Sequence, residues 1–220
     1  VTCVGHPLVD AVHTQLSKTA AREKFLLDKD IRVIGLFPGS RRSEISVLLP
    51  VMLEAAERIE KRHFPIQIVI PQAPGIDESF LQQYLAGSCL NVRVIKDDFY
   101  EVIQACDAIV AASGTVTLEI ALLGVPHFIT YKVSPWSYRI LKRLVKIPYV
   151  GLCNIVTKQP VIKELLQDDV TPVRLEQQLM DLLTHPQRQQ HAENIRQQVK
   201  QALGPSGGAE NAAKLVLSLI

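Results

Sequence analysis

Long apolar runs, blocks of positive charge and paired cysteines are all missing from this sequence of 220 residues. Without about 18 consecutive apolar residues it offers no membrane-spanning helix, and no charged, apolar and cleavage-site series marks a signal peptide. The formal net charge is only +2, and the cations do not form a long block, so a nucleic-acid surface is not indicated. We therefore expect a cytoplasmic domain that does not bind nucleic acid.

The four cysteines lie far apart in the sequence, at Cys3, Cys89, Cys106 and Cys153. Zinc sites and disulfide frameworks usually bring cysteines together in close pairs, whereas isolated thiols are commonly buried and reduced. We expect buried, reduced thiols here, with no metal and no other cofactor.

What the sequence does contain is a regular alternation of apolar strands and helical patterns. Strands are predicted near 31–37, 66–70, 91–95, 107–111 and 126–131, and the hydrophobic content of 47% supports a sizeable core. Parallel strands joined through helices form a sheet that is covered on both faces. The fold class is therefore α/β, a Rossmann-like parallel sheet with helices on both faces and a helical C-terminal tail.

The same patterns predict three regions along the chain. An entry helix from Pro7 to Leu26 and a linker occupy 1–30, the Rossmann-like domain occupies 31–170, and C-terminal helices occupy 171–220. Beyond Pro160 the pattern is helical throughout, with the glycine-rich stretch 204–208 separating the last two helices. Pro50 is expected to kink or divide the helical region from Glu44 to Lys61, because proline cannot donate the interior hydrogen bond.

One small-residue turn is the strongest candidate for chemistry. Ser113, Gly114 and Thr115 follow a buried strand and open a helix, where unpaired backbone N–H groups and the helix dipole favour a phosphate. Glu119 lies one turn further on, where its carboxylate is placed to accept hydrogen bonds from a ribose diol. An ordinary helix cap with a first-turn acid would produce the same pattern.

A second turn follows the strand near 31–37. Gly39 and Ser40 form the turn, and Arg41 projects from it, with a planar guanidinium that can hold two phosphate oxygens. In a doubly wound sheet the carboxyl ends of neighbouring strands share one crevice, so Arg41 and the turn at Ser113 are expected to face the same diphosphate. The loop at Phe99 reaches the same edge, where its backbone groups are placed to meet uracil.

Together these segments resemble lipid A disaccharide synthases, in one order and along nearly the whole chain. The matching runs are 4–10, 37–41 with Glu44, 112–115 with Glu119, 122–126, 131–135, 143–146 with Tyr149 and Val150, Asn154, and 164–167.

The resemblance implies a GT-B glycosyltransferase of which this chain is the C-terminal half. Such an enzyme joins UDP-2,3-diacylglucosamine to 2,3-diacylglucosamine 1-phosphate, or lipid X, and releases UDP. The residues carried over as catalytic are Arg41 for the diphosphate, Glu119 for the nucleotide sugar and Asn154 for the polar lining. The resemblance also implies peripheral attachment to the inner face of the bacterial inner membrane, and a homodimer is a further partner to consider.

The sequence begins at Val1 rather than Met, and we expect that about half of the enzyme implied by the resemblance is absent from it. The N-terminal domain with the general base is expected to lie outside this chain. We therefore expect nucleotide binding without turnover.

The segment 133–146 carries a basic face and one tryptophan. Trp136, Arg139, Lys142 and Arg143 would suit contact with an anionic membrane surface, although a core-packed helix with a solvated face explains the same periodicity. Two other functions stay open at this point. One is a different user of UDP-N-acetylglucosamine with the same fold, either a peptidoglycan glycosyltransferase or an epimerase, and the other is a non-enzymatic module that binds a membrane or a partner.

Overall fold

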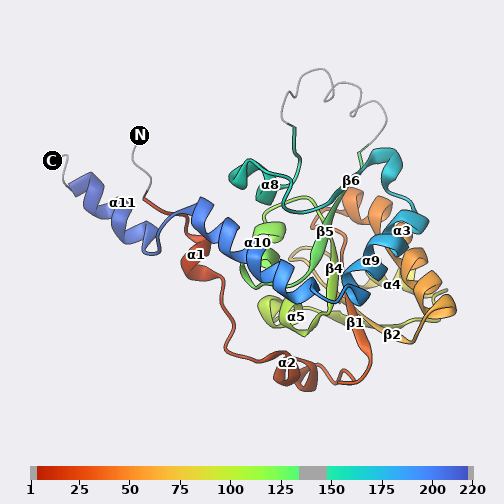
Figure 1. Ribbon diagram of the computed structural model, residues 1–220. Coiled ribbons are helices and arrows are strands. Elements are labelled where there is room, and N and C mark those ends of the chain that lie inside the picture. Colours follow the sequence, from red (N-terminus) through yellow and green to blue (C-terminus); the bar gives the residue numbers. More distant parts are fainter. Residues whose placement is uncertain (1–3, 134–147, 218–220) are drawn as a thin grey trace.

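The computed structural model describes residues 4–133 and 148–217. Six parallel strands form one sheet in the order β3-β2-β1-β4-β5-β6, with helices on both of its faces (Figure 1). The strands are β1 (Arg32–Phe37), β2 (Ile66–Pro71), β3 (Asn91–Ile95), β4 (Ala108–Ala112), β5 (His127–Tyr131) and β6 (Glu164–Leu166). This order reverses between β1 and β4, as in dinucleotide-binding folds.

The central strands are apolar on both sides because each side meets a helical layer. Ile34 and Leu36 pack under α3 (Arg42–Arg62), α4 (Glu78–Leu85) and α9 (Pro172–Thr184). Val33 and Phe37 face the other layer, which contains α2 (Lys18–Lys24), α5 (Phe99–Ala105) and α6 (Val116–Leu122). Burial of alternate residues on opposite faces explains why the strand sequence does not alternate in polarity.

The remaining elements lie near the two ends of the chain or next to β6 in the sequence. They are α1 (Leu8–Ala11), α8 (Leu152–Thr157), the short 3-10 helix η1 (Gln167–Asp169), α10 (Arg188–Leu203) and α11 (Gly208–Leu217). The last two helices are separated at the glycine-rich stretch, as predicted. Figure 1 shows α11 extending away from the sheet. At the start of α11 the carboxylate of Asp10 accepts hydrogen bonds from the N–H groups of Gly207 and Gly208.

Helix α9 belongs to the core although it lies beyond residue 170. Leu175, Leu179 and Leu183 are buried in the same cluster as the strands and α3. The hydrophobic core therefore continues past the limit of 170 that the sequence pattern indicates.

Two predictions about the chain ends are wrong. The entry helix is two short helices, because Val12 is extended after α1 and the Ser17 hydroxyl accepts a hydrogen bond from Ala20 N to begin α2. The region beyond Pro160 is not entirely helical, since β6 pairs in parallel with β5. A strand of three residues is too short to leave a period in the sequence.

Pro50 lies inside the single helix α3, so of the two expected outcomes, a kink or a division, the division does not occur. The buried residues Leu48, Leu49, Met52 and Leu53 on both sides of it hold the helix against the sheet. Cys106 and Cys153 are buried free thiols as expected, but Cys89 is exposed, because it lies in the loop between α4 and the edge strand β3.

A buried ion cluster attaches the entry segment to the sheet. The carboxylate of Asp107, immediately before β4, forms ion pairs with Lys18 and Arg22. Lys18 Nζ lies 2.7 Å from Oδ1, and Arg22 Nη2 lies 2.5 Å from Oδ2. Its Oδ2 also accepts a hydrogen bond from Val33 N at 2.8 Å. Burial alone would raise the pKa of Asp107, but Lys18, the Val33 amide and Arg22 together hold that pKa below its ordinary value.

Candidate functional site

A cavity of about 580 Å³ opens at the carboxyl ends of β1, β2, β3 and β4. It contains the point where the strand order reverses, which is the usual ligand position in open α/β sheets. The structure brings seven of the predicted site residues into its wall, namely Gly39, Ser40, Arg41, Phe99, Ser113, Gly114 and Thr115. The two turns therefore share one crevice, as the strand pattern predicts.

The turn after β1 depends on a glycine at position 39. Gly39 has a φ of +108°, and a Cβ there would lie 2.5 Å from Oε2 of Glu44. Arg41 precedes α3 and donates from Nη1 to Glu44 Oε1 at 2.8 Å, while 77% of its side chain is exposed. An exposed pair of this kind contributes little stability, so Arg41 can exchange Glu44 for an anionic ligand at small cost.

In the turn after β4, some hydrogen-bond donors are already bonded within the protein and others are not. Ser113 N–H bonds to Thr130 O and its hydroxyl donates to Val150 O, both at 3.0 Å. Both protons of Ser113 are therefore committed to carbonyl groups. Among the described residues, the amides of Gly114, Thr115 and Val116 have no hydrogen-bond partner. The donors that this turn can offer to a ligand therefore begin at Gly114 rather than at Ser113.

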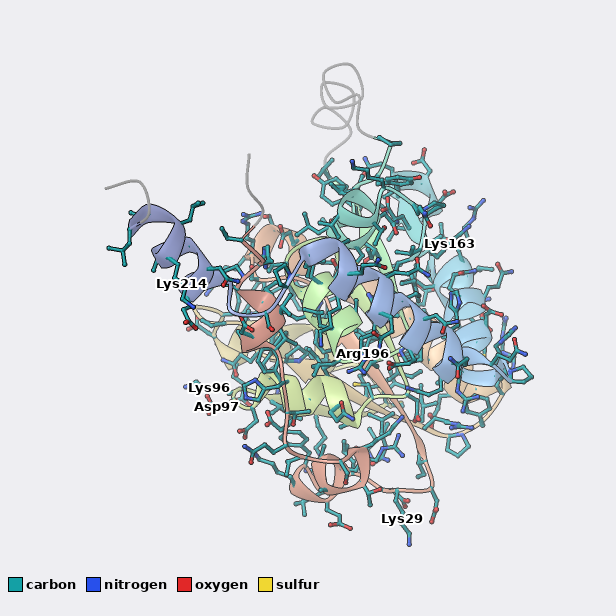
Figure 2. The ribbon with its side chains drawn as sticks, turned by 60° about the vertical axis from the view of Figure 1, so that its left-hand side comes forward. Lys29, Lys96, Asp97, Lys163, Arg196 and Lys214 are labelled. Atoms are coloured by element: carbon teal, nitrogen blue, oxygen red, sulfur yellow. The ribbon has the colours of Figure 1, made fainter. Side chains whose placement is uncertain are left out.

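Part of the cavity wall is aromatic. Phe99 begins α5 after Asp98, which adopts a left-handed conformation with φ of 60°. The ring of Phe99 packs edge-on against Phe37, with centroids 5.8 Å apart. Lys96 and Asp97, which also line the cavity, project outward at the edge of the molecule (Figure 2).

Glu119 lies outside the cavity wall, on the next turn of α6. Its Oε1 accepts a hydrogen bond from the hydroxyl of Tyr100 at 3.2 Å. Burial raises the pKa of Glu119 although the Tyr100 bond opposes that change. Burial and the neighbouring carboxylate in turn raise the pKa of Tyr100.

Asn154 is also outside the cavity wall. The sequence places it after an extended stretch, whereas the structure places it within α8 with 1% of its surface exposed. Its Nδ2 donates to Ile162 O and to Glu164 Oε1, and its Oδ1 accepts from Ile162 N. The amide is thus occupied by the protein itself.

The end of β2 and the loop after it, which were not predicted as part of the site, supply Pro71, Gln72, Ala73 and Pro74 to the wall. Gln72 N bonds to Ile95 O and its side chain donates to Ile76 O, so the loop is firmly built. Two prolines and Gly75 directly after a predicted strand were the available indication of a turn at this sheet edge.

His127 is a buried polar residue of the core. It is buried at the start of β5, its Nδ1 lies 2.9 Å from Val125 O, and burial lowers its pKa to about 4. It borders a second cavity of about 350 Å³ between β5, α9 and α10.

The four residues predicted for membrane contact, Trp136, Arg139, Lys142 and Arg143, lie outside the described residues. None of the helices described is both long and apolar enough to cross a membrane. Within 4–133 and 148–217, no three His, Cys, Asp or Glu side chains gather as a metal site would require.

Comparison with known proteins decides the family. The model of the family described as Lipid-A-disaccharide synthetase matches residues 1–217. The chain belongs to this family. Curated lipid-A-disaccharide synthases of Geobacter sulfurreducens and Nitrosococcus oceani are 43% and 41% identical to it, over its full length. It spans 57% of the length of each.

Solved structures place the family fold among GT-B glycosyltransferases. WaaG, a glycosyltransferase involved in lipopolysaccharide biosynthesis, has a TM-score of 0.56 and 16% identity, covering 96% of this chain and 54% of that protein. MurG of Acinetobacter baumannii has a TM-score of 0.54 and 17% identity, covering 93% and 54% respectively. At such identities the likeness establishes the fold alone.

Proposed function

We propose that this chain is the sugar-nucleotide-binding part of a lipid A disaccharide synthase. The whole enzyme would join UDP-2,3-diacylglucosamine to 2,3-diacylglucosamine 1-phosphate and release UDP. The observation that carries the proposal is the cavity at the strand-order reversal, walled by the turns after β1 and β4. Membership of the family supports this choice of substrates.

In this proposal Arg41 binds the diphosphate. Its guanidinium is exposed, stands in the cavity wall and is held only by Glu44 among its ion-pair partners in the described chain. A guanidinium stabilises the negative charge that develops on a departing nucleoside diphosphate. The unpartnered amides of Gly114 and Thr115 stand in the same wall and add donors for phosphate oxygens.

Glu119 is proposed to accept hydrogen bonds from the ribose. It lies one turn beyond the cavity wall, and its neighbour Tyr100 follows directly on the wall residue Phe99. A ribose diol seated beside Phe99 would then meet the carboxylate and the aromatic ring together. Asn154 is assigned an indirect role, because its amide is fully used within the protein.

The general base is proposed to lie in the part of the enzyme that this chain does not include. The chain alone would therefore bind the donor without forming disaccharide. Peripheral attachment to the inner membrane, through the segment containing Trp136 and Lys142, belongs to the same proposal. Neither a metal nor a cofactor takes part in it.

Disaccharide formation tests this function. The chain is assayed alone and after joining to the N-terminal portion of a family member, with UDP-2,3-diacylglucosamine and lipid X. We expect product only from the joined protein, and loss of product when it carries Arg41→Ala. Product from the chain alone would contradict the proposal that the general base lies outside this chain. Turnover of UDP-N-acetylglucosamine without lipid would contradict the substrate class.

A further inference from the structure

The run from Glu164 to Gln167 matches the family pattern but lies outside the cavity wall. Glu164 begins the edge strand β6, and its carboxylate is surrounded by donors. Oε2 accepts from Val150 N at 3.0 Å, and Oε1 accepts from Gly151 N at 2.9 Å and from Asn154 Nδ2 at 2.7 Å. Three donors on one side chain require an acceptor-only group, which glutamate provides and glutamine does not.

The backbone is shaped to allow this approach. A Cβ on Gly151 would lie 2.3 Å from Ile129 Cδ1 and 3.0 Å from Glu164 Oε1. Only a residue without a side chain lets the chain come this close to β5 and β6. The contact between Glu164 and the stretch 150–151 is therefore built into the fold.

The stretch held by Glu164 is linked to the cavity wall by the hydroxyl of Ser113. Val150 O accepts the proton of Ser113 Oγ at 3.0 Å, and Ser113 stands in the cavity wall. Since Ser113 N–H is also bonded, to Thr130 O, Ser113 has no proton left for a ligand. Its oxygen can only accept a hydrogen bond.

We propose that Glu164 is a positioning residue for this cavity. By fixing Val150 O it commits the Ser113 proton, so that Ser113 presents an acceptor to a hydroxyl or N–H group of the sugar nucleotide rather than a donor to its phosphates. Asn154, which bonds the same carboxylate, supports Glu164 in this task. The inference rests on the proposed function, since it names a partner for one group of the bound sugar nucleotide.

A double-mutant cycle tests the proposal. Affinities for UDP and for UDP-N-acetylglucosamine are measured calorimetrically on the wild-type chain, Glu164→Gln, Ser113→Ala and the double variant. We expect each single change to weaken binding about tenfold, as loss of one well-placed hydrogen bond does. The double variant should bind no more weakly than Ser113→Ala, because Glu164 acts through Ser113.

The two ligands show which group Ser113 meets. A loss with both ligands assigns it to uracil or ribose, and a loss with UDP-N-acetylglucosamine alone assigns it to the sugar. Asp168→Asn is the matched control, since Asp168 is an exposed acid near Glu164 in sequence and should leave both affinities unchanged. Hydrogen exchange at Val150 and Gly151 should quicken in Glu164→Gln and stay unchanged in the control.

Three results overturn the proposal. Unchanged affinity for both ligands in Ser113→Ala does so whether or not Glu164→Gln folds. Multiplicative effects in the double variant would mean that Glu164 acts on binding independently of Ser113. A folded wild-type chain that binds neither ligand would contradict the proposed function itself, which distinguishes that failure from the other two.

Discussion

The hydroxyl of Tyr100 donates a hydrogen bond to Oε1 of Glu119 across the gap between α5 and α6. This bond opposes the effect of burial, which raises the pKa of the Glu119 carboxyl. Through Tyr100, which follows the wall residue Phe99, the ionisation of Glu119 is connected to the cavity edge.

Changing Tyr100 to Phe should alter how nucleotide binding depends on pH. A protonated Glu119 loses acceptor capacity for a ribose diol, so UDP affinity should fall as the pH drops through the pKa of Glu119. Without Tyr100 that pKa rises further, and the fall should begin at a higher pH. Calorimetric titrations from about pH 4 to pH 8 measure this; Tyr84→Phe, on α4, is the control, and identical profiles for Tyr100→Phe and wild type would refute the role of Glu119.

Gly114 offers a steric test of where the ligand lies. A Cβ at Gly114 meets nothing within 4 Å, and the same holds for Gly87, which is outside the cavity wall. Gly114→Ala should fold normally but weaken UDP binding about tenfold or more, because a ligand on the turn would collide with the methyl group. Gly87→Ala should bind like wild type, and equal UDP affinity in the two variants would show that nothing packs against the turn.

Asp107→Asn should be strongly destabilising. Removing the charge leaves Arg22, which is itself buried, without its counterion, and such a change costs about 3 to 5 kcal/mol in free energy of unfolding. Urea denaturation measures the loss. Asp77→Asn, which breaks the exposed pair with Arg42, should cost about 0.5 kcal/mol or less, and equal losses would contradict the importance of burial.

The same group makes a contribution that depends on pH. The pKa of Asp107 is lower in the folded chain than its ordinary value, so its stabilisation is present above the unfolded value of about 3.9 and disappears as the pH falls through the folded value. The stability difference between wild type and Asp107→Asn should accordingly narrow in acid. A difference that stays constant down to pH 2 would be inconsistent with an ionised Asp107.

Leu26 is a position where the native residue is strained. It follows α2 with a φ of 54°, and its side chain is 76% exposed. Glycine adopts this conformation without the steric cost of about 1 kcal/mol that other residues meet. Leu26→Gly should raise the free energy of unfolding in urea by about 0.5 to 1 kcal/mol, while Leu26→Ala, which keeps a Cβ, should not; a lower value for Leu26→Gly than for Leu26→Ala would refute the strain.

The parts of the fold that could be predicted are those with a long local pattern. The apolar strand before Ser113 and the helix after it indicate a parallel sheet, and parallel strands bring the turns at Arg41 and Ser113 to one edge. The three residues of β6 carry no such pattern, so their pairing with β5 is decided by tertiary contacts.

The surroundings of Asn154 could not be predicted from the sequence, because they too depend on tertiary contacts. Its partner Glu164 is ten residues away, and the bond between them depends on Gly151 letting the chain approach β5. Resemblance to the family predicts a role for Asn154, but only the structure shows that its amide is occupied within the protein. The hydrogen bond from the Ser113 hydroxyl to Val150 O likewise could not be predicted from the sequence of the turn.

The most direct measurement is calorimetric titration of UDP into the wild-type chain and into Arg41→Ala and Glu119→Ala, at modest salt and without added metal. The account predicts saturable binding to the wild type, weakened about tenfold or more by either change, as loss of a charge-assisted hydrogen bond would do. Absence of UDP binding by the folded wild-type chain, or equal affinity in all three proteins, would contradict it.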